Sequence, residues 1–143
     1  MDGALSLRIK NLLEEIPPAT ELAAQWLVTR GVPLEETYFA RMAIDEIVSN
    51  CVKYGYDDAT EHHIEIELAL ANGRLMIAIT DDGHFFNPLD HPEPDTSLPI
   101  EERPIGGLGI HLLRKMADDI EYERTFQRNR LKIHKTISAS SSP

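Results

Sequence analysis

The chain has 143 residues, of which 42% are hydrophobic and 27% are charged, which fits one folded domain and excludes a disordered chain. Its net charge of −10 excludes a general nucleic-acid binder, because such proteins neutralise phosphates with Lys and Arg. The charge is uneven, since residues 1–102 carry 20 acidic and 6 basic side chains whereas residues 103–143 carry 4 acidic and 8 basic ones; the last third is therefore compatible with an anion site.

The sequence shows no pattern of export or membrane insertion. The single cysteine, Cys51, cannot form an internal disulfide. No apolar run approaches the ~18 residues of a membrane span, and the first residues lack the basic and then apolar pattern of a signal peptide. We therefore predict a cytoplasmic protein with one domain over residues 1–137 and a flexible, serine-rich tail over residues 138–143.

The first third of the chain predicts one strand and two helices. Partial alternation over residues 5–13 predicts an edge strand. Pro17 and Pro18 predict the start of a helix that ends near Arg30. A second, longer helix is predicted from about residue 35 to Tyr54, because acidic residues open it. Its apolar stripe at helical spacing consists of Met42, Ala43, Ile47, Cys51 and Tyr54.

The remainder predicts two hairpins separated by a loop and a helix. Strict alternation over residues 63–71 predicts a half-buried strand, and Asn72-Gly73 predicts a tight turn into a return strand over residues 74–80. A proline-rich loop over residues 81–105 is typical of a binding loop. A helix then ends near residue 117, and strands follow over residues 120–126 and 130–138. This order predicts an α+β fold, a two-layer sandwich with helices on one face of a mostly antiparallel sheet.

The second helix carries the first group of candidate site residues, Glu46, Asn50 and Lys53. At 100° per residue these three positions share one side of the helix. A carboxylate, an amide oxygen and an ammonium together suit hydrated Mg²⁺ and phosphate. The alternative is an ordinary solvated helix face.

Two further groups lie on loops. Asp81-Asp82-Gly83 follows the return strand, where a carboxylate beside a glycine lets a flat ligand approach the backbone, and Asp81 could accept a hydrogen bond from the exocyclic amine of adenine; the alternative is a simple turn. The glycines of residues 106–109 open a helix and expose N–H groups that bind phosphate, with Arg103 just upstream. The alternative is a flexible loop before a helix.

The order of these groups resembles the GHKL (Bergerat-fold) ATPase superfamily and, within it, the bacterial anti-sigma factor serine-protein kinases of the RsbW type. Residues 45–56 (DEIVSNCVKYGY) resemble the N-box of that family. Residues 81–88 (DDGHFFNP) resemble its adenine box, and residues 102–110 (ERPIGGLGI) resemble its lid and glycine box. The resemblance covers about residues 5–137.

The resemblance implies ATP and Mg²⁺ as cofactors and a role for each matching residue. Glu46 would be the general base that takes the proton from a serine hydroxyl, and Asn50 would hold Mg²⁺. Asp81 would bind adenine, with Gly83 allowing close approach. The phosphates would lie against the backbone and basic side chains of Lys53, Arg103, Gly107, Leu108 and Gly109.

Two positions depart from the family pattern. Tyr54 stands where the family often has His. The turn between the last two strands, which usually carries Gly and often a hydroxyl residue that contacts adenine through water, is predicted here at residues 127–129 and reads Gln-Arg-Asn. This difference would alter the adenine site.

The resemblance also implies partners. It implies a STAS-type anti-anti-sigma protein as the phosphorylated substrate, a sigma factor as a second partner and a homodimer. A second hypothesis is a module that binds ATP and gates partner binding without phosphoryl transfer. A third hypothesis, a histidine-kinase-like catalytic domain, is less favoured, because no helix with a phospho-acceptor His is expected before the domain. Nucleic acid and membrane are not expected partners.

Overall fold

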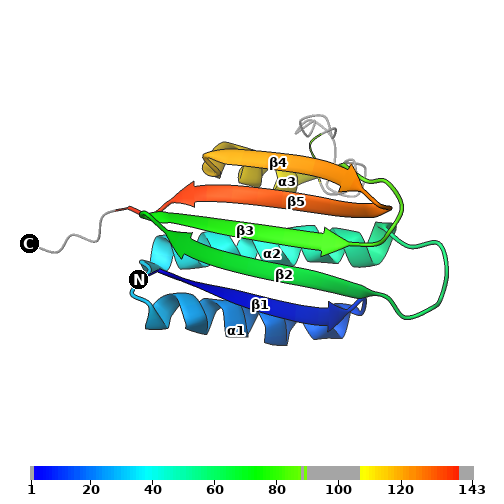
Figure 1. Ribbon diagram of the computed structural model, residues 1–143, viewed down its shortest axis with the longest axis horizontal. Coiled ribbons are helices and arrows are strands. Elements are labelled where there is room, and N and C mark those ends of the chain that lie inside the picture. The colour runs from blue at the N-terminus through cyan, green and yellow to red at the C-terminus, as the bar shows by residue number, and fades with distance from the viewer. Residues whose placement is uncertain (1, 88, 90–106, 139–143) are drawn as a thin grey trace, which may run out of the picture.

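The computed structural model describes residues 2–87, 89 and 107–138, and for residues 107 and 108 the backbone alone. Within these residues, five strands form one sheet, and three α-helices lie together behind it (Figure 1). In chain order the elements are β1 (Gly3–Lys10), a short 3-10 turn (Leu13–Glu15), α1 (Ile16–Thr29), α2 (Leu34–Tyr54), β2 (His63–Ala71), β3 (Arg74–Asp81), α3 (Gly107–Met116), β4 (Asp119–Thr125) and β5 (Arg128–Thr136).

The sheet has the order β1-β2-β3-β5-β4, and each neighbouring pair is antiparallel. This confirms the predicted α+β sandwich. The β2–β3 hairpin turns at Asn72 and Gly73, which both have positive φ values, 54° and 73°, as a two-residue turn between twisted strands requires. The antiparallel β3–β5 pairing places Asp81, at the end of β3, directly opposite Asn129 in β5.

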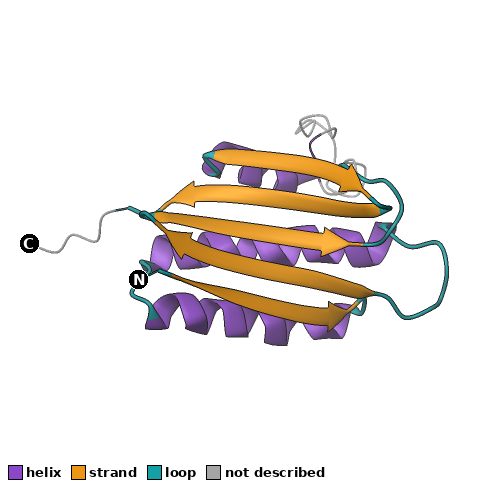
Figure 2. Cartoon of the chain, in the orientation of Figure 1, coloured by secondary structure: helices purple, strands orange, loops and turns teal. Residues whose placement is uncertain are grey.

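One face of the sheet and the inner sides of the helices form the core. The inward residues of β2, Ile64, Ile66, Leu68 and Leu70, are at most 2% exposed, as its alternation predicts. All three helices lie on this face in a single layer (Figure 2). Helix α2 contributes several of the fully buried side chains, among them Phe39, Ile44 and Val48.

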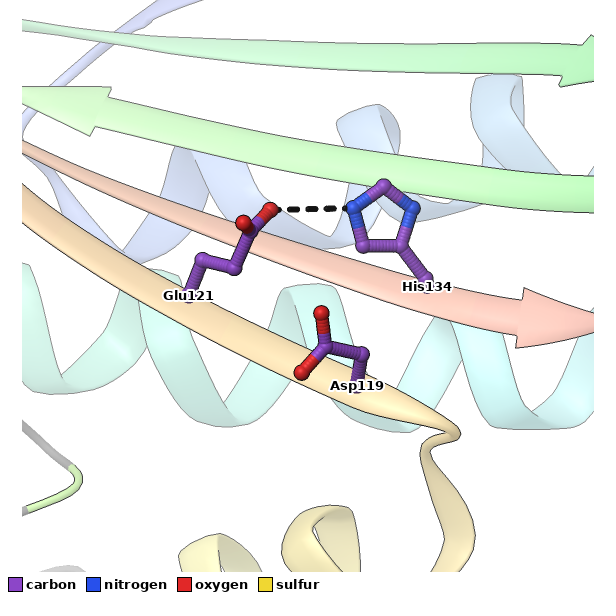
Figure 3. Close-up of side chains that lie close together, drawn as sticks. All are labelled: Asp119, Glu121 and His134. Carbon is purple, nitrogen blue, oxygen red and sulfur yellow. Dashed lines mark hydrogen bonds and ion pairs between the residues drawn. The ribbon is translucent and has the colours of Figure 1, made fainter.

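The other face of the sheet carries charged side chains that pair across strands. Arg130 of β5 reaches over β3 to Glu67 of β2, with 3.1 Å between Nη1 and Oε1. On β4 and β5, Asp119, Glu121 and His134 lie together, and Oε2 of Glu121 is 3.2 Å from Nε2 of His134 (Figure 3). These contacts are of the cross-strand kind that stabilises a solvent-facing sheet surface.

Two predicted boundaries are wrong. The first strand ends at Lys10 rather than Leu13, because the N–H of Lys10 donates to Oε1 of Glu15 at 2.9 Å and the chain turns away from β2. The last hairpin turns at Phe126 and Gln127, which have φ values of 52° and 63°, and not at residues 127–129. Asn129 is therefore a strand residue.

The tail that the sequence predicts lies mostly outside the described residues. Ser138, its first residue, donates its N–H to Oε1 of the buried Glu36 at 2.7 Å. Within the described part of the chain, no helix is both long and apolar enough to cross a membrane.

Candidate functional site

The candidate residues gather at one end of the sheet. The C-terminal ends of α2, β3 and β4 all lie there, together with the turn that leads into β5 (Figure 1). Helix α3 contacts α2, and its first turn adjoins the same region. Residues far apart in the sequence, such as Ile47 and Leu131, therefore line one site.

Glu46 and Asn50 form the part of the site that α2 supplies. They are one helical turn apart, and Nδ2 of Asn50 donates to Oε1 of Glu46 at 3.3 Å. Asn50 is only 5% exposed, which excludes a solvated helix face at this position, whereas Lys53 is exposed. Since the amide nitrogen of Asn50 faces Glu46, its amide oxygen faces away from that carboxylate and offers a hard ligand.

The carboxyl group of Glu46 has a raised pKa. Burial is the main cause, and the charge of Asp45 adds to it, while the hydrogen bond from Asn50 and the charge of Lys53 act in the opposite direction. A raised pKa makes the carboxylate a better proton acceptor, because it moves the group toward the working pH.

Helix α3 begins directly against Glu46. A Cβ atom built on Gly109 would overlap Cδ and Oε2 of Glu46, so the glycine permits this close approach. The first N–H groups of a helix have no partner within the helix and carry its positive dipole end. Gly107 and Leu108 start α3, whereas Arg103 lies outside the described residues.

Asp81 is the buried carboxylate of the site. It is 6% exposed, and three donors converge on it. Oδ1 accepts from the N–H of Gly83 at 2.9 Å and from Nδ2 of Asn129 at 3.0 Å, and Oδ2 accepts from the thiol of Cys51 at 3.3 Å. Burial, followed by the negative charge of Asp81, raises the pKa of the Cys51 thiol.

Gly83 has a packing role that its place after Asp81 does not reveal. A Cβ atom at this position would overlap the carbonyl oxygen of Gly55, at the end of α2. The same carbonyl accepts a hydrogen bond from the N–H of His84 at 2.9 Å. The segment after β3 therefore lies directly on the C-terminus of α2.

We expect Gly83→Ala to lower the free energy of unfolding by about 1–3 kcal/mol, because the added methyl group meets backbone that cannot rotate away. Urea unfolding measures this loss, with the exposed strand variant Ser6→Ala as the control. A Gly83→Ala protein as stable as the control would contradict the contact between Gly83 and Gly55.

The side chain of Asn129, on β5, connects the end of β3 to β4. The sequence predicts this residue, wrongly, in a turn. Besides Asp81, its Nδ2 donates to the carbonyl of His84 at 2.9 Å. Its Oδ1 accepts from Nη1 of Arg124 at 2.9 Å and from the hydroxyl of Tyr122. Arg124 also donates to the carbonyl of Gly83 at 3.0 Å. The side chain of Asn129 thus fixes both Asp81 and the backbone that follows it.

A small cavity of about 20 Å³ opens beside Asp81. Aliphatic side chains and two aromatic rings form most of its wall, and the polar groups are those around Asp81. Apolar walls around one buried carboxylate match the chemistry of a flat ring that carries an amino group, but the cavity is smaller than such a ring. The lining residues are Ile47, Cys51, Ile79, Asp81, Phe86, Tyr122, Asn129 and Leu131.

Comparisons with known proteins give matches over most of the chain. The pattern of the family described as "Histidine kinase-like ATPase domain" matches residues 9–135. The chain is 32% identical over 126 residues to a protein of Bacillus cereus named "Serine-protein kinase RsbW", covering 80% of this chain and 78% of that one. A Bacillus anthracis protein of the same name is 36% identical over the same shares. The "Anti-sigma F factor" of Oceanobacillus iheyensis is 24% identical over 123 residues, covering 85% of this chain and 83% of that one.

Solved structures share the fold. The RsbU and RsbW domains of a Mycobacterium tuberculosis protein superpose with a TM-score of 0.65 at 14% identity, over 94% of this chain and 32% of that chain. A blue-light activated histidine kinase of Erythrobacter litoralis superposes with a TM-score of 0.52 at 16% identity, over 75% of this chain and 32% of that chain.

Proposed function

The chain belongs to the histidine kinase-like ATPase domain family, and we propose that it is an anti-sigma serine-protein kinase that binds Mg-ATP between α2, β3 and α3. Its similarity to proteins named serine-protein kinase and anti-sigma F factor supports this activity. The proposed substrate is a serine of a STAS-type anti-anti-sigma protein. A sigma factor is the proposed second partner, and a homodimer is the proposed assembly.

One observation carries the proposal: a buried carboxylate at an apolar slot and a carboxylate–amide pair against a helix N-terminus lie at the same end of the sheet. The apolar lining of the slot matches the adenine ring in chemistry, and Asp81 would accept a hydrogen bond from the amino group of the ring once the slot has widened to admit it. The N–H groups at the start of α3, from Gly107 to Gly109, would face the phosphates.

The donor set beside Glu46 fits Mg²⁺, because this ion prefers oxygen ligands and keeps several waters. We propose that the amide oxygen of Asn50 holds it. When bound, Mg²⁺ neutralises charge on the phosphate oxygens. Lys53, which is close enough to Glu46 to lower its pKa, would neutralise further negative charge together with Arg103.

The carboxylate of Glu46 would take the proton of the serine hydroxyl as the serine oxygen attacks the γ-phosphorus. The bond from that phosphorus to the β–γ bridging oxygen breaks, and ADP leaves with the electron pair. Burial supports this role, because it raises the pKa of Glu46.

Transfer of radiolabelled γ-phosphate tests the proposal. We would incubate the protein with labelled Mg-ATP and a candidate STAS-domain protein, and expect label on the STAS protein. A variant of that protein with its acceptor serine changed to Ala is the control and should stay unlabelled. Tight nucleotide binding without any transfer would instead support a module that gates partner binding.

A further inference from the structure

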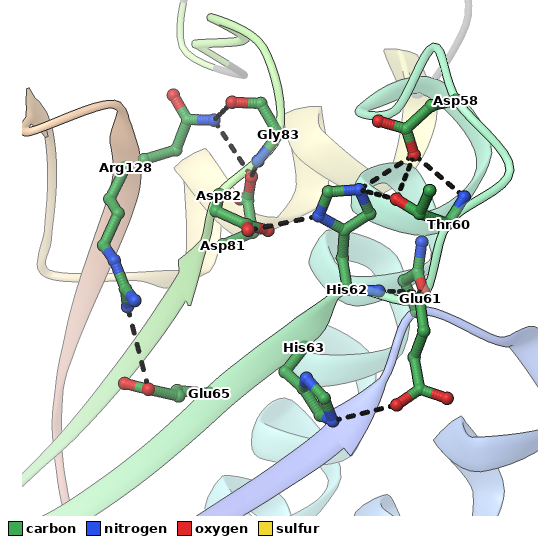
Figure 4. Close-up of polar contacts among 12 residues, drawn as sticks. Asp58, Thr60, Glu61, His62, His63, Glu65, Asp81, Asp82, Gly83 and Arg128 are labelled. Atoms are coloured by element: carbon green, nitrogen blue, oxygen red, sulfur yellow. Dashed lines mark hydrogen bonds and ion pairs between the residues drawn. The ribbon is translucent and has the colours of Figure 1, made fainter.

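His62 lies between two carboxylates at the edge of the site. Its Nδ1 is 3.1 Å from Oδ2 of Asp82, and its Nε2 is 2.9 Å from Oδ1 of Asp58 (Figure 4). The hydroxyl of Thr60 lies 2.7 Å from the same oxygen of Asp58. The side chain of His62 is 20% exposed, whereas those of Asp58 and Asp82 are 56% and 43% exposed, so these contacts lie at the surface.

Both ring nitrogens of His62 therefore face carboxylate oxygens. A neutral imidazole has one N–H and can donate to only one of them, whereas the imidazolium ion donates to both. The hydrogen bonds to Asp82 and then to Asp58 raise the pKa of His62. The ring also stacks on Tyr56, with 4.5 Å between centroids and 28° between planes, an arrangement that favours a cation on the aromatic face.

The backbone of His62 is itself held in place. Its N–H donates to Oδ1 of Asn11 at 3.0 Å, and its carbonyl accepts from the N–H of Asn11 at 3.0 Å. These two hydrogen bonds fix the backbone of His62 beside Asn11, the residue that follows β1. From there its side chain reaches Asp82, the residue between Asp81 and Gly83. The segment that carries Asp81 already rests on Gly55, and His62 adds a charged contact from the outer side.

We propose that His62 is a positioning residue for the nucleotide site: as imidazolium it ties residues 58–62 to Asp82, and so holds Asp81 and Gly83 in the arrangement that binds adenine. The inference rests on the proposed function, because it assumes that this site binds ATP. Asp58 keeps two further donors, the N–H and the hydroxyl of Thr60, so the contact that depends on the charge of His62 is the one with Asp82. Loss of the proton removes that charge, which weakens the contact with Asp82, loosens the segment and weakens nucleotide binding.

Among the described residues, the ionisable groups that face His62 are the carboxyls of Asp58 and Asp82 and the phenol of Tyr56. The neighbouring His63 points the other way and pairs with Glu61, with 3.5 Å between Nε2 and Oε2 (Figure 4). His63 is therefore a matched control, since it is the same residue type at the next position in the chain, where β2 begins.

The direction of the pH effect follows from the raised pKa. The contact is complete below the ordinary histidine value of 6.5 and is lost as the pH rises through the higher value in the folded protein. Affinity for nucleotide should therefore fall on the alkaline side. A change of one unit in the pKa of His62 between the free and bound forms corresponds to roughly tenfold in affinity.

The test is calorimetric titration with a magnesium complex of a non-hydrolysable ATP analogue between pH 6 and pH 9. The wild-type protein and His63→Gln should lose roughly tenfold in affinity across this range. His62→Gln should bind more weakly at pH 6 and change less with pH. Ionisation of the analogue is common to all three proteins and cancels in the comparison.

Parallel affinity curves for wild type and His62→Gln would overturn the inference and leave the proposed function standing. No binding by the wild type at any pH would contradict the proposed function itself. A second measurement covers a His62→Gln protein that fails to fold: an NMR titration of His62 in wild type with and without the analogue should give a higher pKa in the bound form, and an unchanged pKa would also overturn the inference.

Discussion

Replacing Glu46 with Gln should lower the rate of phosphoryl transfer by about 10²–10⁴-fold while leaving ATP binding largely intact. The amide keeps the shape of the side chain and can still accept the hydrogen bond that Asn50 donates to Oε1, but it cannot take a proton. Single-turnover transfer of γ-phosphate to the substrate protein measures the first effect, and calorimetry with the ATP analogue measures the second.

The matched control is Glu35→Gln, on an exposed position in the first turn of the same helix. It removes the same charge far from the site and should transfer phosphate at the wild-type rate. The wild-type rate should also rise with pH through a value above the ordinary glutamate pKa of 4.5, because burial raises the pKa of Glu46. Undiminished transfer by Glu46→Gln would exclude Glu46 as the base.

Asp81→Asn should weaken binding of the ATP analogue by about tenfold to a hundredfold, since hydrogen bonds to a charged group contribute roughly 1.5–3 kcal/mol. It should also reduce the free energy of unfolding by about 1–3 kcal/mol. The reason is local: donors from Cys51, Gly83 and Asn129 all point at the carboxylate, and an amide NH₂ in place of one oxygen leaves at least one of them without an acceptor.

Calorimetry without urea, where both proteins are folded, measures the loss of affinity. Urea unfolding measures the loss of stability separately. Asp119→Asn, at an exposed position on β4, is the control for loss of an aspartate charge from the sheet. An Asp81→Asn protein that binds the analogue as tightly as wild type would contradict the placement of adenine beside Asp81.

The sequence predicts those parts of the fold that depend on local signals. The strict alternation of β2 and the Asn72-Gly73 turn determine the first hairpin, and both strands lie where they are expected. The predicted turn of the last hairpin, residues 127–129, extends two residues beyond the observed turn at Phe126 and Gln127, because Asn129 is a common turn residue whereas Phe126 and Gln127 are not. The register that overrides this preference is set by the pairing of β5 with β3.

The candidate site also has a part that local sequence signals predict and a part that they do not. Spacing along one helix is local, so the pair of Glu46 and Asn50 could be expected from the sequence. The contacts of Asp81 with Asn129 and of His62 with Asp82 span 48 and 20 residues, and they exist only once the sheet order brings those segments together. No pattern within a single segment indicates them.

The small size of the cavity beside Asp81 has a kinetic consequence. A volume of about 20 Å³ holds one or two water molecules, whereas a purine ring is several times larger. The wall of the cavity, which includes Phe86 and Tyr122, would therefore have to widen before the ring can enter. Association should then be slower than the roughly 10⁵–10⁷ per molar per second of simple docking and should level off at high nucleotide concentration, because opening of the aromatic wall becomes the limiting step.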